Sequence, residues 1–97
     1  MILEVAEVYI RPNTQPAFES AIRESLDKYI SKSKGFISFE LQKSIEDETR
    51  YLFLIHWETL EDHTVGFRQG ETFKYHRELI SPYFAKDPFV HHFNRQF

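Results

Sequence analysis

The stretch RYLFLIHWE, residues 50 to 58, decides the fold of this 97-residue chain. Its core, YLFLIHW, is apolar on both faces, whereas a strand with one face in water alternates apolar and polar side chains. We therefore expect a strand from Arg50 to Glu58 that is covered on both sides. Such a strand lies at the centre of a sheet or at an interface between subunits.

The chain before this stretch predicts a strand and then a helix. Residues 2 to 10 alternate and place one apolar set on a single face, Ile2, Ala6, Val8 and Ile10. Apolar side chains then recur at helical spacing from about residue 14 to residue 33. We expect Asn13 or Thr14 to cap the start of this helix, and Gly35 lies just beyond its end.

The remaining elements follow from the same periodicities and from turn residues: a strand over 36 to 43, helices over 60 to about 69 and about 72 to 80, and a last strand over 89 to 97. Ile37, Phe39 and Leu41 are expected to share one face of the second strand. Thr59 is expected to cap the helix that follows the central strand.

The predicted order, β-α-β-β-α-β, is typical of a ferredoxin-like α+β fold in one domain spanning residues 1 to 97. Both helical regions would cover one face of an antiparallel sheet. The other face would carry large apolar side chains with nothing to cover them. Packing against the same face of a second copy would bury them, so we expect a homodimer.

Composition excludes several classes of function. The net charge of −3 offers no excess of positive charge to a nucleic acid backbone. The absence of cysteine rules out disulfides and cysteine-ligated metal sites. No apolar run is long enough to span a membrane, and the N-terminus lacks the pattern of a secretory signal, so we expect a cytoplasmic protein.

The five histidines do not predict a metal site. None forms the His-x-x-x-His pair of a helical zinc site, and the adjacent His91 and His92 point to opposite faces of a strand. We therefore expect no metal. Structural or surface roles are favoured for these side chains.

His63 is the leading candidate for chemistry. It lies four residues before Phe67, so the two share a helix face, and Gly66 lets another group approach closely. A titratable nitrogen beside an aromatic wall is able to bind a phenolic substrate and accept its proton. From spacing alone, the stronger alternative is that His63 packs on the core and hydrogen-bonds a backbone carbonyl.

Four segments together resemble the antibiotic biosynthesis monooxygenase family, a group of dimeric α+β barrels: FLIHWE (53 to 58), TLEDHTVGFR (59 to 68), TFKYHRELI (72 to 80) and PFVHHF (88 to 93). The resemblance covers nearly the whole chain. It implies dimers formed by sheets packed face to face. For some members it also implies oxidation of multi-ring phenols to quinones by molecular oxygen, with no metal or flavin, whereas other members degrade haem.

The resemblance implies a catalytic role for His63 and a pocket for a small aromatic ligand. Trp57 and Phe67 would line this pocket, and His92 is a second candidate to accept a proton or hold an oxygen anion. Tyr75 and Tyr83 are weaker candidates as hydrogen-bond donors. No cofactor is expected, because an electron-rich phenol carries most of the chemistry itself.

Two other functions stay open. The same fold is able to serve as a non-catalytic dimeric domain that binds small ligands or acts in stress response, because fold does not fix function. Haem degradation is a minor third possibility. Its branch of the family needs an asparagine on the first strand, which this chain lacks, and His76 lies near the haem-ligand position but not on it.

Overall fold

The central strand lies inside the sheet, as its sequence predicts. The structure, a computed structural model, describes residues 1 to 97. Its antiparallel sheet has the order β2-β3-β1-β4, with bounds β1 (Ile2–Tyr9), β2 (Phe36–Lys43), β3 (Arg50–Trp57) and β4 (Phe89–Phe93). The helical segments are α1 (Gln15–Ser25), η1 (Leu26–Ile30), η2 (Asp62–Phe67), α2 (Phe73–Ile80) and η3 (Ser81–Tyr83).

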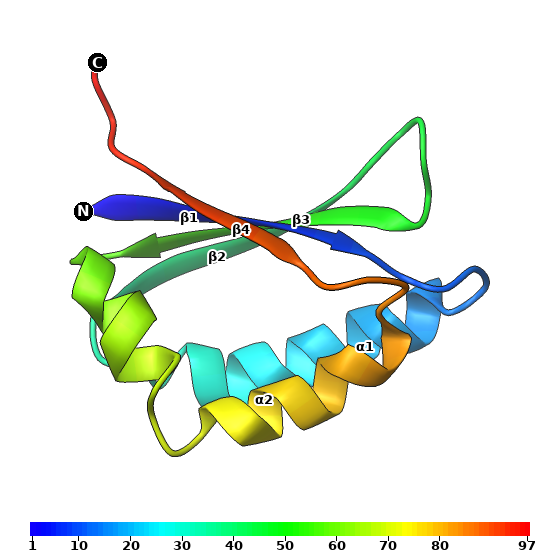
Figure 1. The fold of residues 1–97 in the computed structure, drawn as a ribbon, viewed down its shortest axis with the longest axis horizontal. Helices are drawn as coiled ribbons and strands as arrows, with labels where there is room; N and C mark the ends of the chain where they lie inside the picture. The colour runs from blue at the N-terminus through cyan, green and yellow to red at the C-terminus, as the bar shows by residue number, and fades with distance from the viewer.

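All helical segments lie on one side of the sheet, with α1 and α2 side by side (Figure 1). This arrangement confirms the ferredoxin-like α+β fold. Every second side chain of β3 is buried against the helices, and these are Tyr51, Phe53, Ile55 and Trp57. The intervening Leu52, Leu54 and His56 face the other way and are only half-buried. A single chain therefore covers one face of β3 and leaves the other accessible.

The two predicted caps differ in outcome. The backbone N–H of Asp62 donates to the Thr59 hydroxyl at 3.1 Å, so the cap after β3 is confirmed. Thr14 occupies the capping position of α1, but no side chain caps that helix. The Thr14 hydroxyl instead donates to the carbonyl of Arg11 at 2.7 Å, so the capping prediction for α1 is wrong.

The face assignment within β2 is also wrong at two residues, Ile37 and Phe36, which was expected on the face opposite Phe39 and Leu41. A register shift between Phe36 and Ser38 interrupts the pairing with β3. Because the shift changes the alternation, Phe36 packs on the core together with Phe39 and Leu41, while Ile37 stays 45% exposed.

The last strand is shorter than predicted and ends at Phe93, not at residue 97. Phe93 pairs with Leu3, close to the point where β1 begins at Ile2. Residues 94 to 97 therefore have no neighbouring strand to pair with and extend away from the sheet (Figure 1).

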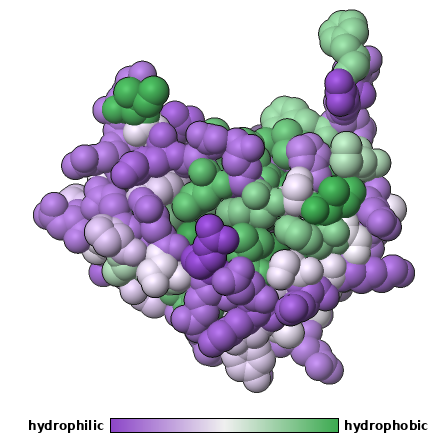
Figure 2. All heavy atoms as spheres, turned by 180° about the vertical axis from the view of Figure 1, so that it is seen from behind, coloured by the Kyte–Doolittle hydropathy of each residue, from purple (hydrophilic) through white to green (hydrophobic).

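A second apolar surface lies beside the β2 edge. Figure 2 shows the face behind the view of Figure 1, where apolar atoms gather at the centre within a hydrophilic rim. A groove of about 630 Å³ between β2 and α1 carries Ile22, Leu26, Phe39 and Leu41.

None of the helices combines the length and the apolar character that crossing a bilayer requires.

Gly35 fixes how the segment after β3 approaches the sheet. Its φ of +83° lies in the left-handed region that favours glycine. A Cβ atom built on Gly35 would lie 2.7 Å from the Cβ of Asp62, which is closer than two carbon atoms approach. Asp62 begins η2, the segment that carries His63, so the missing side chain at Gly35 allows η2 to settle against the end of β2.

Replacing Gly35 with alanine should destabilise the fold. Gly35→Ala forces a side chain into a left-handed conformation and pushes Asp62 away, at an expected cost of about 1 to 3 kcal/mol in the free energy of unfolding. Urea denaturation measures this cost. Gly66→Ala is the matched control, since its nearest neighbour would lie 3.8 Å away in ordinary contact. Equal stability of the two variants would contradict this account.

Candidate functional site

A cavity of about 550 Å³ lies between the sheet and the helices. The sheet contributes mostly apolar side chains to its wall, with one carboxyl group among them: Glu4, Ala6, Phe53, Ile55 and Val90. The helical side contributes aromatic rings and basic groups: His63, Phe67, Arg68, Phe73, His76 and Arg77. This volume lies within the range of small-molecule binding sites, which run from about 300 to 1,000 Å³.

Glu4 places a carboxyl group in the wall of this cavity. The residue is only 5% exposed, and the indole Nε1–H of Trp57 donates to its Oε1 at 3.0 Å. Burial raises the pKa of Glu4 to about 7, and the bond from Trp57 and the charge of Arg68 only partly oppose this shift. Glu4 therefore exchanges its proton near neutral pH.

His63 lies between this carboxyl group and a second histidine. Its Nε2 is 3.2 Å from Oε1 of Glu4, and its Nδ1 is hydrogen-bonded to Nε2 of His92 at 2.8 Å. Its ring stacks on Trp57, with 5.4 Å between the ring centroids. Burial lowers the pKa of His63 to about 3, so the imidazole is neutral at neutral pH.

His76 forms a separate polar contact on the helical side of the cavity. Its Nδ1 is hydrogen-bonded to the hydroxyl of Ser25 at 2.6 Å, and both residues are buried. Burial lowers the pKa of His76 to about 4. Its ring contacts Phe67 and Phe73, with centroid distances of 5.2 Å and 5.5 Å. His76 is thus a neutral group within an aromatic wall.

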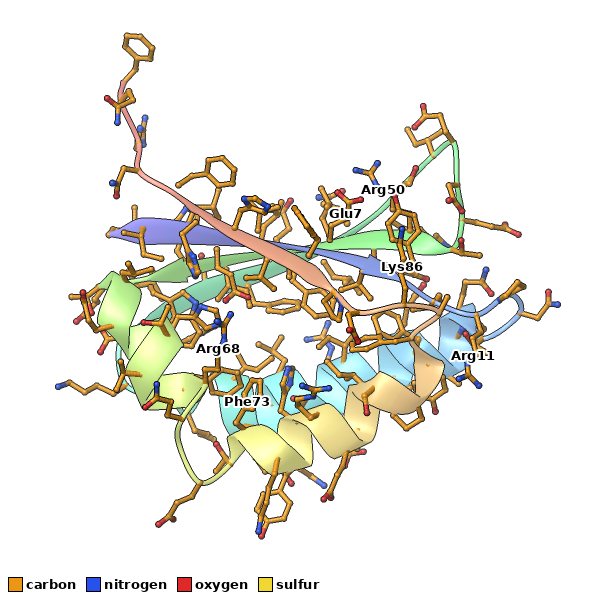
Figure 3. All side chains as sticks on the ribbon, in the orientation of Figure 1. Glu7, Arg11, Arg50, Arg68, Phe73 and Lys86 are labelled. Atoms are coloured by element: carbon orange, nitrogen blue, oxygen red, sulfur yellow. The ribbon has the colours of Figure 1, made fainter.

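Arg68 brings a positive charge to the same space. Figure 3 shows Arg68 and Phe73 between the sheet and the helices, each on the helical side. Both residues line the cavity, and Arg68 forms no ion pair within the protein. A guanidinium group in a mostly apolar wall favours a ligand that carries or develops negative charge.

Four of the six residues predicted for the site lie together. His63 and Phe67 line the cavity, Trp57 lies beneath His63, and His92 contacts His63 from β4. Tyr75 and Tyr83 do not line the cavity. Tyr75 is 43% exposed and stacks on Tyr29, and Tyr83 packs edge-on against Phe18.

Three further residues of the cavity wall, Glu4, Arg68 and His76, were not among the residues predicted for the phenol site. A signal existed for Glu4, because it occupies the one gap in the apolar face formed by Ile2, Ala6, Val8 and Ile10. His76 carried a weaker signal as a polar residue on the apolar face of α2, three residues after Phe73. Nothing in the spacing around Arg68 indicates that it points inward.

The histidines do not converge on a metal site. His63 and His76 line the cavity and His92 contacts His63 from β4, but the structure contains no group of three or more histidine, aspartate or glutamate side chains arranged to hold a metal ion. The Nδ1 of His76 and both nitrogens of His63 already contact other side chains.

The family model described as antibiotic biosynthesis monooxygenase matches residues 1 to 79. This chain belongs to that family. The match includes β1, β3, η2 and nearly all of α2, and so most of the cavity wall.

Two relatives of higher identity support this assignment. The uncharacterised protein YczJ of Bacillus subtilis (strain 168) is 38% identical over 93 residues, which cover 96% of this chain and 97% of YczJ. The crystal structure of a presumed antibiotic biosynthesis monooxygenase from Bordetella bronchiseptica is 31% identical, with a TM-score of 0.94 over 99% of this chain and 97% of that one.

A second solved structure shares the fold at lower identity. The monooxygenase from the gene ActVA-Orf6 of Streptomyces coelicolor, in complex with Nanaomycin D, is 20% identical. Its TM-score is 0.84 over 99% of this chain and 88% of that one. The fold is therefore shared well beyond the range of clear sequence similarity.

The raised pKa of Glu4 predicts a pH-dependent stability difference. The folded protein holds this proton more tightly than the unfolded chain, so folding loses stability as pH rises from about 4.5 to about 7. Glu4→Gln removes this loss, and its stability relative to wild type should rise by about 3 kcal/mol across that range. Urea denaturation at several pH values measures the difference.

The buried histidines change the pH dependence of folding stability in the opposite direction, because their pKa values are lowered in the folded state. They are present in both proteins, so most of their contribution cancels in the difference. Glu58→Gln, at an exposed position after β3, makes the same chemical change in contact with water and serves as the control. A Glu4→Gln difference that does not vary with pH would contradict the raised pKa.

Proposed function

We propose that the cavity binds a phenolic aromatic molecule and catalyses its oxidation by molecular oxygen without a metal or an organic cofactor. The observation that carries this proposal is the contact of Glu4 with His63 inside a wall that is otherwise largely apolar and aromatic. Membership of the monooxygenase family supports it. The related structure that holds Nanaomycin D supports a small organic ligand in this fold.

The reaction requires little from the protein beyond removing the substrate from water and providing one group that accepts its proton. Removal of a proton from an anthrone, or from its phenol tautomer, gives an anion rich enough in electrons to reduce oxygen. One electron passes to oxygen, and the two radicals combine to form a carbon–oxygen bond. After protonation, the resulting hydroperoxide loses water and leaves a carbonyl group. One oxygen atom enters the quinone, the other leaves in water, and the substrate supplies both hydrogens.

The residues of the cavity fit these steps. Glu4 lines the cavity and exchanges a proton near neutral pH, so it is suited to accept the proton of the substrate. His63 and Trp57 both contact Oε1 of Glu4, so the other carboxyl oxygen has no hydrogen-bond partner within the protein and is free to accept the proton. Arg68 is suited to stabilise the substrate anion and the peroxide anion. Phe67 and Phe73 supply the aromatic wall.

Loss of His63 should lower turnover with the dimer still folded. His63→Ala removes the partner of Glu4, and we expect a decrease of about 10²-fold or more. Oxygen uptake on a panel of anthrones and hydroquinones measures turnover, and a thermal melt checks folding. Glu78→Ala, which removes an exposed side chain from α2 outside both the cavity and the uncovered face of the sheet, is the control.

The outcomes separate the remaining functions. Unchanged uptake by a folded His63→Ala protein would remove His63 from the mechanism. Retention of an aromatic ligand, with no uptake on any substrate by the wild type, would favour a non-catalytic binding domain.

We also infer that the chain acts as a homodimer joined through the uncovered face of the sheet. This face carries half-buried apolar side chains at its centre and exposed phenylalanines on β4, and these are Leu3, Val5, Leu52, Leu54, Phe89 and Phe93. A second copy presents the same set in a two-fold contact, which removes both surfaces from water.

Light scattering coupled to size exclusion should report twice the chain mass at micromolar concentration. Leu54→Lys places a charge at the centre of this face and should yield a folded monomer. Ile45→Lys makes a comparable change in the β2–β3 turn, where the side chain is 95% exposed, and should leave the dimer intact. A wild-type monomer at all concentrations would rule out this interface.

A further inference from the structure

His63 connects two groups in different surroundings. Glu4 faces the cavity, whereas His92 is half-buried on β4, the edge strand of the sheet. Glu4 and His92 are direct partners in the pairing of β1 with β4. The ring of His63 bridges them from η2, 3.2 Å from the carboxyl oxygen and 2.8 Å from Nε2 of His92.

The directions of the two contacts of His63 are coupled. A neutral imidazole carries one N–H, so it donates through one nitrogen and accepts through the other. If Nε2 of His63 accepts a hydrogen bond from the Glu4 carboxyl, Nδ1–H donates to His92. If Nε2–H donates to the Glu4 carboxylate, Nδ1 accepts a hydrogen bond from His92. The remaining partner of Glu4, the indole of Trp57, only donates and cannot take a proton away.

We propose that Glu4, His63 and His92 form a proton wire that connects the cavity with water at the β4 edge of the sheet. With Glu4 protonated, its O–H points to Nε2 of His63, and the Nδ1–H of His63 donates to Nε2 of His92. One proton then shifts across each contact, and the Nδ1 of His92 releases one to water.

The products of this shift balance. Glu4 becomes a carboxylate, and His63 and His92 each carry their hydrogen on Nε2. One proton has left Glu4 and one has entered water. No electron moves, and neither imidazole gains a net proton.

The charges around the wire keep its imidazoles neutral. Burial lowers the pKa values of His63 and His92, and the positive charge of Arg68, the residue just after η2, lowers both further. When protonated, His76 on α2 acts in the same direction on His63, and protonated His91 on β4 does so on His92. The carboxyl group is therefore the place where the wire stores its proton.

The use of the wire in catalysis rests on the proposed function. A ligand that fills the cavity closes the direct path between Glu4 and water. The wire reaches water at the β4 edge of the sheet and not through the cavity, so Glu4 is able to release its proton while the ligand is bound. This supplies the carboxylate that the oxidation needs as its base.

Nitrogen-15 NMR of the imidazoles tests the wire without any substrate. As pH rises through the value of about 7 at which Glu4 loses its proton, the hydrogen of His63 should move from Nδ1 to Nε2. His92 should change tautomer with the same midpoint. Glu4→Gln, which cannot ionise, should abolish both changes. Fixed tautomers in the wild type, or two different midpoints, would overturn the wire.

A kinetic comparison tests whether the proton reaches water through His92. His92→Gln keeps a polar group of similar reach but lacks the ring that passes a proton, and should lower turnover about tenfold. Lys74→Gln, at an exposed position on α2 that lines neither the cavity nor the uncovered face of the sheet, should match the wild type. Wild-type turnover by the His92 variant would overturn the wire as the working route. A tautomer change in a protein that oxidises no phenol would support the wire and overturn only the proposed function.

Discussion

A carboxyl group enclosed by apolar side chains is the constraint on which the arrangement of this domain depends. Removing Glu4 from water is costly, and the fold compensates in part with the indole N–H of Trp57 on Oε1 and with the positive charge of Arg68, while the imidazole of His63 contacts the same oxygen. Trp57 must therefore end β3 fully buried, and η2 must cross the end of the sheet. The compensation is incomplete, and for this reason the carboxyl group holds its proton near neutral pH instead of staying ionised.

The elements were predictable where the signal is local. The doubly apolar stretch of β3, the helical spacing of α1 and the hydroxyl cap at Thr59 each depend on residues close together in the chain. The outward position of Ile37 was not predictable, because a shift in backbone pairing changes the alternation without a mark in the side-chain pattern. The end of β4 depends on where β1 begins, because its last residue, Phe93, pairs with Leu3 ninety residues earlier.

The candidate site also combines contacts between residues near in the chain, which were predictable, with contacts between distant residues, which were not. Trp57, His63 and Phe67 are near in sequence, and their association followed from spacing. The contact of Glu4 with His63 joins segments at opposite parts of the chain, so it appears only when η2 folds over β1. Tyr75 is aromatic like its neighbours, yet its place on α2 turns it to the outside, which residue type alone does not reveal.

Ala6 gives the cavity a simple means of changing its capacity. It lies two residues after Glu4 on the same face of β1, and its partners on the two neighbouring strands, Phe53 and Val90, also line the cavity. Its single methyl group leaves room at the centre of the floor. A leucine at this position would fill part of that room and add apolar contacts, so ligand size and the rigidity of the empty protein would change together. Selection for larger or smaller ligands therefore has a route through one residue of the sheet that leaves the carboxyl group and its partners in place.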